Sequence, residues 1–106
     1  MALTEEKGQP VAKGTTPLSR KEAEELARQV PSWKLVDSRL EEDFRFKDFA
    51  ETMHFVNRVA QVAQEEDHHP DIEISYNKVH LTLSTHSIGG LSRNDFIVAA
   101  KIERLL

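Results

Sequence analysis

Pro70 limits how this chain can fold more than any other residue, because it separates two different hydrophobic patterns. Before it, from residue 48 to 67, apolar residues recur at the spacing of a helix, and a proline cannot continue that helix. After it, from residue 71 to 83, apolar and polar residues alternate, as they do in strands with one buried face. The sequence therefore predicts a long helix that ends before Pro70 and is followed by strands.

Helix starts are marked by pairs in which a short polar residue is followed three positions later by an acidic residue, as in a capping box. The pairs are Ser19 with Glu22, Asp48 with Glu51, and Ser92 with Asp95. We expect the first helix to end at Pro31 and the second to run towards Asp67. The last helix presents an apolar face that includes Phe96 and Ile102.

Two hairpins are predicted between these helices. Residues 33–46 alternate on either side of a turn at Asp37 and Ser38, with Trp33, Phe44 and Phe46 as core residues. Residues 72–86 alternate on either side of a turn at residues 76–77, which puts His86 at the end of the second strand. The predicted order is α-β-β-α-β-β-α, which indicates an α+β fold with helices packed on one face of a sheet.

The chain length of 106 residues suits one domain with one core. We place this domain at residues 18–106. Residues 1–17 lack apolar periodicity and are predicted to form an N-terminal tail or an extended strap. The second helix carries an apolar arc wider than one sheet requires, which suggests a second burial partner such as another copy of the chain.

Composition excludes several classes of function. The net charge of −4 argues against direct binding of nucleic acid, and the absence of cysteine excludes disulfides and thiol catalysis. No apolar run reaches membrane-spanning length and no signal region is apparent. We therefore expect a cytoplasmic protein.

Four of the five histidines lie between Glu65 and His86. Histidine can give and accept protons near neutral pH, so His68, His69 and His86 are candidate acid and base groups. Adjacent helical residues point about 100° apart, but a helix end before Pro70 frees the His69 ring to turn into the same cleft as that of His68. His54 and His80 are interpreted as surface residues.

Other chemistries are less favoured. Three imidazoles could hold zinc or iron, yet two ligands one helical turn apart are missing. No nucleophile elbow frames the serines near His86, and the pair Gly89 and Gly90 lacks a phosphate-loop lysine. Asp95 could serve only as a helix cap, and Tyr76 could simply pack in its hairpin.

Residues 19–106 resemble the pterin-4a-carbinolamine dehydratase family. The motifs that carry the resemblance are Asp67-His68-His69-Pro70, Tyr76-Asn77-Lys78-Val79-His80, Leu83-Ser84-Thr85-His86, Gly90-Leu91-Ser92 with Asp95, and Phe46-Lys47-Asp48-Phe49. The resemblance implies a four-stranded antiparallel sheet with helices on one side, assembled as a homodimer or homotetramer. It also implies dehydration of 4a-hydroxytetrahydropterin to quinonoid dihydropterin, which recycles a tetrahydrobiopterin-type cofactor, with no metal or organic cofactor.

By position, the resemblance implies catalytic roles for His68, His69 and His86. It implies substrate contacts for a second set of residues: Asp67, Pro70, Tyr76, Ser84, Thr85 and Asp95. We expect His69 or His86 to act as the acid and His68 as an orienting or base residue, with Asp67 or Asp95 holding one imidazole in a single tautomer.

Two positions depart from the family pattern. Gln64 stands where a charged residue is usual, so a one-turn contact to His68 would be polar. Ile72 replaces an aromatic residue. The alternatives are a non-enzymatic pterin-binding or assembly protein, or a regulatory dimerisation partner or coactivator, as for animal members that bind a homeodomain transcription factor.

Overall fold

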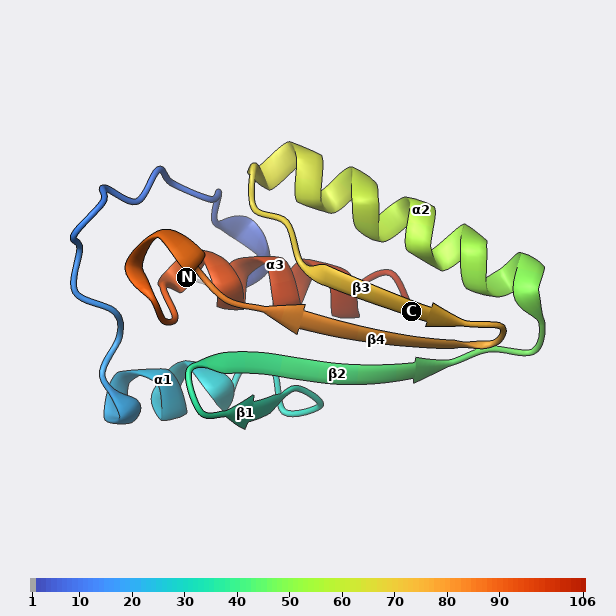
Figure 1. The fold of residues 1–106 in the computed structure, drawn as a ribbon, viewed down its shortest axis with the longest axis horizontal. Coiled ribbons are helices and arrows are strands. Elements are labelled where there is room, and N and C mark those ends of the chain that lie inside the picture. The colour runs from blue at the N-terminus through green and yellow to red at the C-terminus, as the bar shows by residue number, and fades with distance from the viewer. Residues whose placement is uncertain (1) are drawn as a thin grey trace.

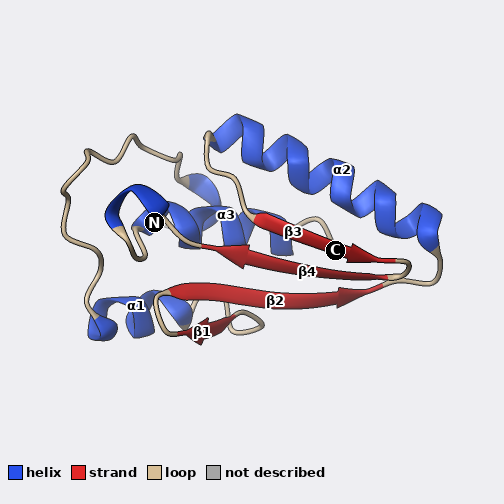
Figure 2. Cartoon of the chain, viewed as in Figure 1, coloured by secondary structure: helices blue, strands red, loops and turns tan. Residues whose placement is uncertain are grey.

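The computed structural model describes residues 2–106 and has the predicted element order, with two additional short 3-10 helices. Figures 1 and 2 show one sheet with the long helix α2 running beside it. The bounds are η1 Leu3–Glu5, α1 Arg20–Ala27, β1 Lys34–Val36, β2 Arg39–Arg45, α2 Phe49–Glu66, β3 Asp71–Ser75, β4 Lys78–Leu83, η2 His86–Ile88 and α3 Arg93–Glu103. The predicted α+β fold class is confirmed.

The four strands are antiparallel and lie in the order β1-β2-β4-β3. The central pair joins the two hairpins, with Leu40 opposite Leu83 and Phe44 opposite Val79. The side chains that alternate with these, including Asp43 and His80, point to the open face of the sheet. In this central pair, period-two alternation assigns one face to the core and the other to solvent, as predicted. The edge strand β3 has no buried residue, and Ile74 on it is exposed.

The core lies between the sheet and helices α2 and α3. Leu40, Leu81, Leu83 and Phe96 are completely buried. Trp33 meets Phe44 edge-on at a ring-centroid distance of 6.1 Å. The aromatic residues predicted to fill the core do so, except that Phe46 is only partly buried at its margin.

The predicted helix starts are confirmed by hydrogen bonds. The Ser19 hydroxyl accepts from the Glu22 N–H at 3.1 Å, and the Asp48 carboxylate accepts from the Glu51 N–H at 2.9 Å. The third start is described with the site. At each start an orphan backbone N–H gains a partner within three residues, which is why sequence patterns locate helix starts well.

Two predicted ends are wrong. Helix α1 ends at Ala27 and not at Pro31, because hydrogen-bonded turns follow in which the Val30 N–H donates to the Ala27 carbonyl at 3.1 Å. These turns direct Val30 into the core. His86 does not end a strand: β4 stops at Leu83 and His86 begins η2.

Residues 2–17 form an N-terminal strap, which contains η1 and then runs without further helix or strand to the start of α1. Figure 1 shows this blue segment passing from beside α3, around one end of the sheet, to the start of α1. Leu3 is buried in the core, and the Arg93 guanidinium on α3 donates two hydrogen bonds to the Glu6 carboxylate at 2.6 and 2.7 Å. These bonds lower the pKa of Glu6. The strap is therefore fixed to α3, and the boundary at residue 18 stays a prediction.

Within residues 2–106, no helix combines the length and the apolar character needed to cross a membrane.

Candidate active site

The Asp95 carboxylate is the centre of a buried hydrogen-bond network at the start of α3. Its side chain is 0% exposed. Oδ2 accepts from the Ser92 backbone N–H at 2.9 Å, as the capping pattern predicts, and from the Thr85 hydroxyl at 2.8 Å. The hydroxyls of Thr85 and Ser92 lie 2.7 Å apart. These contacts leave Oδ1 directed to a different partner.

That partner is His68, whose Nε2 lies 2.5 Å from Asp95 Oδ1. Helix α2 ends when Asp67 takes the left-handed conformation, with φ of 50° and ψ of 44°, and the chain then turns His68 towards α3. The His68 side chain is 12% exposed. An imidazole that donates from Nε2 to a carboxylate keeps Nδ1 as a proton acceptor. Nδ1 has no hydrogen-bond partner within residues 2–106.

His69 is exposed and lies 2.6 Å, by its Nε2, from the Gln64 amide oxygen. The sequence predicted a polar contact between Gln64 and His68, and the structure gives this contact to His69. The reason is the left-handed turn at Asp67, which ends the helical spacing on which the prediction relied. Helical periodicity therefore does not predict the contact between Gln64 and His69.

The other predicted site residues of this region lie on the loops around Asp95. Thr85 is buried, Ser84 and Pro70 are half-buried, and His86 is exposed at the start of η2. The Thr85 N–H donates to the Gly90 carbonyl at 2.8 Å and thereby turns the chain from β4 to α3. The structure thus joins Thr85 and Asp95 to His68 by hydrogen bonds.

Tyr76 lies at the opposite end of the molecule from this network. It forms the turn between β3 and β4 with φ of 50°, is 63% exposed and stacks on Phe49 at a centroid distance of 6.3 Å. Phe49 begins α2 and His68 follows its end. The 18-residue helix therefore separates Phe49, and Tyr76 stacked on it, from His68 by roughly 27 Å at 1.5 Å per residue. A contact between Tyr76 and substrate stays a prediction.

A cavity of about 520 Å³ opens beside His68. Asp67, His68 and Thr85 line it, while His69 and His86 do not belong to its lining within residues 2–106. Small-molecule sites commonly have volumes of about 300–1,000 Å³. The cavity is therefore large enough for a small organic molecule, with an imidazole and a carboxylate at its wall.

Sequence reasoning missed part of this cavity. Strap residues 7–11 line it, together with Glu66, Ser87 and Asn94. Glu66 is buried, and its carboxylate accepts from the Lys101 ammonium at 2.7 Å and from the Gly8 N–H at 2.7 Å. Burial raises the pKa of Glu66, but these hydrogen bonds outweigh burial and the net shift is downward. No motif or periodicity marks these residues.

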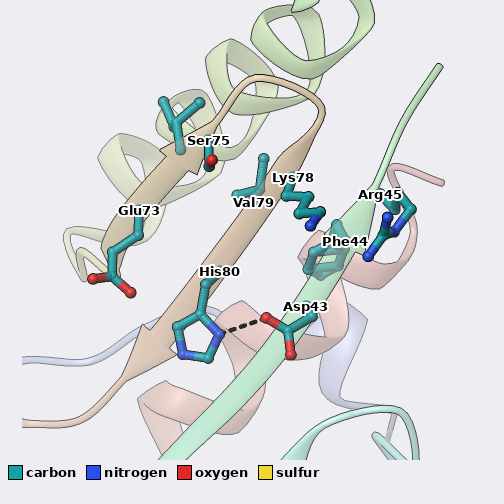
Figure 3. Close-up of a pocket in the computed structure, with 9 residues that line it drawn as sticks. Asp43, Phe44, Arg45, Glu73, Ser75, Lys78, Val79 and His80 are labelled. Carbon is teal, nitrogen blue, oxygen red and sulfur yellow. Dashed lines mark hydrogen bonds and ion pairs between the residues drawn. The ribbon is translucent and has the colours of Figure 1, made fainter. Parts of the chain in front are cut away.

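A second histidine cluster lies on the open face of the sheet, where Figure 3 shows His80 directed at Asp43. His80 Nδ1 is 2.7 Å from Asp43 Oδ1, and Nε2 is 3.2 Å from Glu41 Oε1. The hydrogen bond to Asp43 raises the pKa of His80, with further contributions from the charges of Glu41 and Glu73. A hollow of about 720 Å³ lies beside it. Within the described chain, no group of three or more histidine or acidic side chains is arranged to hold a metal.

Comparisons with known proteins relate this arrangement to one family. The sequence model described as "Pterin 4 alpha carbinolamine dehydratase" matches residues 16–105. A protein from Nitrosomonas eutropha named "Putative pterin-4-alpha-carbinolamine dehydratase" is 48% identical over 105 residues, covering 98% of this chain and 93% of its own.

Two solved structures are similar in fold. A "transcriptional coactivator/pterin dehydratase" from Brucella melitensis has a TM-score of 0.80 and 34% identity, covering 85% of this chain and 98% of its own. A "pterin dehydratase-like protein" described as a RuBisCO assembly factor of the alpha-carboxysome has a TM-score of 0.59 and 26% identity, covering 70% and 88%. With a family match over most of its length, the chain belongs to the pterin-4a-carbinolamine dehydratase family.

Proposed function

We propose that this protein removes water from a 4a-hydroxytetrahydropterin to give a quinonoid dihydropterin, and so recycles a tetrahydrobiopterin-type cofactor. The observation that carries the proposal is the 2.5 Å contact between the buried Asp95 and His68, which lines a cavity. Family membership supplies the substrate class. The cavity volume suits a bicyclic pterin.

The reaction needs two proton transfers. The bond from carbon 4a to its hydroxyl oxygen breaks, and the oxygen takes a proton from an acid and leaves as water. The electrons of the ring nitrogens form the new double bond, and a base removes one proton from a ring nitrogen or from a conjugated substituent. One proton is given and one is taken, so the step is balanced without metal or redox cofactor.

We assign His68 as the base or orienting residue. Asp95 holds the proton on His68 Nε2, which leaves Nδ1 as the acceptor. The acid is His69, which follows the end of α2, or His86, which begins η2; both side chains are exposed. Asp67, Pro70, Ser84 and Thr85 are proposed to surround the substrate, with Tyr76 as a further predicted contact.

We further propose that the protein is a cytoplasmic homodimer or homotetramer. Apolar side chains of Phe46, Phe55 and Leu106 line a surface hollow of about 530 Å³ between α2 and the C-terminus. Phe49 is also exposed. Such a face is suited to burial by a second copy of the chain. Light scattering after gel filtration tests this, and a monomeric mass at micromolar concentration would refute it.

The deciding experiment follows quinonoid dihydropterin formation from enzymatically made 4a-hydroxytetrahydropterin. We expect the wild type to accelerate formation over the spontaneous reaction. In the His69→Ala, His86→Ala double variant we expect a loss of about a hundredfold or more, as is usual for a positioned acid or base. A folded wild type that gives no acceleration would contradict the proposal.

A second candidate is a regulatory or assembly protein that does not turn over pterin. The names of the Brucella and alpha-carboxysome proteins favour it, because one is called a transcriptional coactivator as well as a pterin dehydratase and the other a RuBisCO assembly factor. The same assay separates the two candidates. Absence of turnover together with a stable complex, recovered with a protein of the source organism and identified by mass, would favour the second.

A further inference from the structure

The N-terminal strap contributes a wall to the cavity beside His68, and this contribution carries an inference that rests on the proposed function. Residues 7–11 line the cavity together with Asp67, His68 and Thr85. The family sequence model begins only at residue 16. The alignment with the Nitrosomonas eutropha protein covers 98% of this chain and so extends into the strap. The wall therefore lies outside the residues that the family model matches.

The strap is held on α3 by contacts that fix the position of this wall. The Asn94 side-chain amide pairs with the backbone of Gln9: Oδ1 accepts from the Gln9 N–H at 2.9 Å and Nδ2 donates to the Gln9 carbonyl at 2.6 Å. Asn94 is buried. A side chain that satisfies both backbone groups of one residue holds that residue in place much as a neighbouring strand would.

The strap also crosses the end of α2, immediately before the two histidines. The Lys7 ammonium donates to the Glu65 carbonyl at 3.4 Å, which places a cation at the negative end of the helix dipole. The Gly8 N–H donates to the Glu66 carboxylate at 2.7 Å. A Cβ atom added to Gly8 would lie 2.6 Å from the Glu66 carbonyl oxygen, so only glycine fits this crossing.

The cavity wall built by the strap combines apolar side chains with polar groups. Pro10 and Val11 supply apolar surface, and Lys7 and Gln9 supply hydrogen-bond donors. Sites for flat heterocycles combine apolar walls with a few placed polar groups. We propose that residues 7–11 of the strap form a wall of the pterin site and that this wall sets the affinity for the substrate without taking part in proton transfer.

The test is the full-length Gly8→Val variant, with the kinetic constants for 4a-hydroxytetrahydropterin and the Kd for 7,8-dihydrobiopterin, a pterin that has no 4a hydroxyl to lose. The bulkier side chain must push the strap off the end of α2. We expect KM and Kd to rise about tenfold, as for one or two lost hydrogen bonds. We expect kcat to stay within about threefold, since only binding shared by ground and transition states is lost.

Asn94→Ala is the second variant, because it releases Gln9 without inserting bulk, and it decides the matter if Gly8→Val fails to fold. Lys13→Ala is the matched control: Lys13 is an exposed strap residue outside the cavity lining, so all constants should stay at wild-type values. Wild-type KM and Kd in folded Gly8→Val and Asn94→Ala would overturn the inference while leaving the proposed function intact.

The two proposals can fail separately. A wild type that binds 7,8-dihydrobiopterin but does not dehydrate the substrate refutes the proposed function. The Kd values of the variants then still test whether residues 7–11 contribute to pterin binding. A wild type that neither binds nor dehydrates refutes both. A kcat that falls as far as KM rises would also overturn the inference, because the strap would then act on the chemical step.

Discussion

Two histidines of this protein contact carboxylates, and their surroundings differ in nearly every respect. His68 meets Asp95, which is 0% exposed and holds two further hydrogen bonds. His80 meets Asp43, whose side chain is 77% exposed, on the open face of the sheet. The larger hollow lies beside His80 and the smaller beside His68. The contrast teaches that burial and fixed geometry, rather than the presence of a histidine-carboxylate contact or the size of a hollow, distinguish a candidate catalytic pair.

Turnover should separate the two histidines most strongly. His68→Ala is expected to lower kcat/KM for 4a-hydroxytetrahydropterin by about 10²–10⁴-fold, the range for loss of a positioned acid or base. His80→Ala should change it by less than about twofold, because His80 lies outside the cavity lining. Stopped-flow absorbance measures both. Equal losses of kcat/KM in the two variants would contradict a specific role of His68 in proton transfer.

Removal of the carboxylate should cost much more stability in the pair of His68 and Asp95 than in the pair of His80 and Asp43. Asp95→Ala leaves the Ser92 N–H, the Thr85 hydroxyl and His68 without their acceptor in a buried place. We expect the free energy of unfolding to fall by about 3 kcal/mol. Asp43→Ala removes an exposed partner and should cost less than about 1 kcal/mol. Urea unfolding compares them, and a cost for Asp43→Ala as large as that for Asp95→Ala would break the distinction.

The contribution of the ion pair between Glu66 and Lys101 to stability should depend on pH in the acid range. Glu66→Gln leaves Lys101 without its carboxylate, and we expect a loss of about 2 kcal/mol at neutral pH. The pKa of Glu66 is lowered below its ordinary value of 4.5. Its contribution is therefore fully present above pH 4.5 and is lost as the pH falls through the folded pKa. The stability difference between wild type and variant should shrink in acid, and a difference constant down to pH 2 would argue against the pair.

The exposed cluster should show the opposite dependence and the smallest effect. The pKa of His80 is raised from 6.5, chiefly by the hydrogen bond to Asp43. Its contribution is therefore fully present below pH 6.5 and is lost as the pH rises through the folded pKa. His80→Gln should destabilise the protein by less than about 1 kcal/mol at pH 6 and by almost nothing at pH 9. Thermal unfolding at both pH values tests this sign, with His54→Gln as an exposed control.

The fold could be predicted from the sequence because its signals are local. Capping pairs act over three residues and strands over alternate positions, so Ser19, Asp48 and Ser92 were found as helix starts without knowledge of any distant contact. The predicted end of α1 is too late because Pro31 marks only the point beyond which a helix cannot continue. The packing of Val30 into the core decides that the helix stops earlier.

The candidate site was predictable only in part. Family motifs and the helix break point to His68, and the sequence leaves both Asp67 and Asp95 as candidates for the carboxylate that holds one of the imidazoles. The structure gives the contact to Asp95, 27 positions away in sequence. The wall formed by residues 7–11 was not predicted, because the pairing of Gln9 with Asn94 spans 85 positions and leaves no periodic trace. Contacts of this kind depend on tertiary structure alone.

The left-handed backbone at Asp67 has a consequence for how folding and function compete in this chain. Glycine is the residue best suited to such a conformation, and a carboxylate at the carbonyl end of α2 is electrostatically unfavourable. Asp67→Gly should therefore raise the free energy of unfolding by up to about 1 kcal/mol, which a higher melting temperature would report. The same change removes an acidic group from the cavity wall. A variant that is more stable yet binds 7,8-dihydrobiopterin more weakly would identify Asp67 as a position where the protein gives up stability for activity.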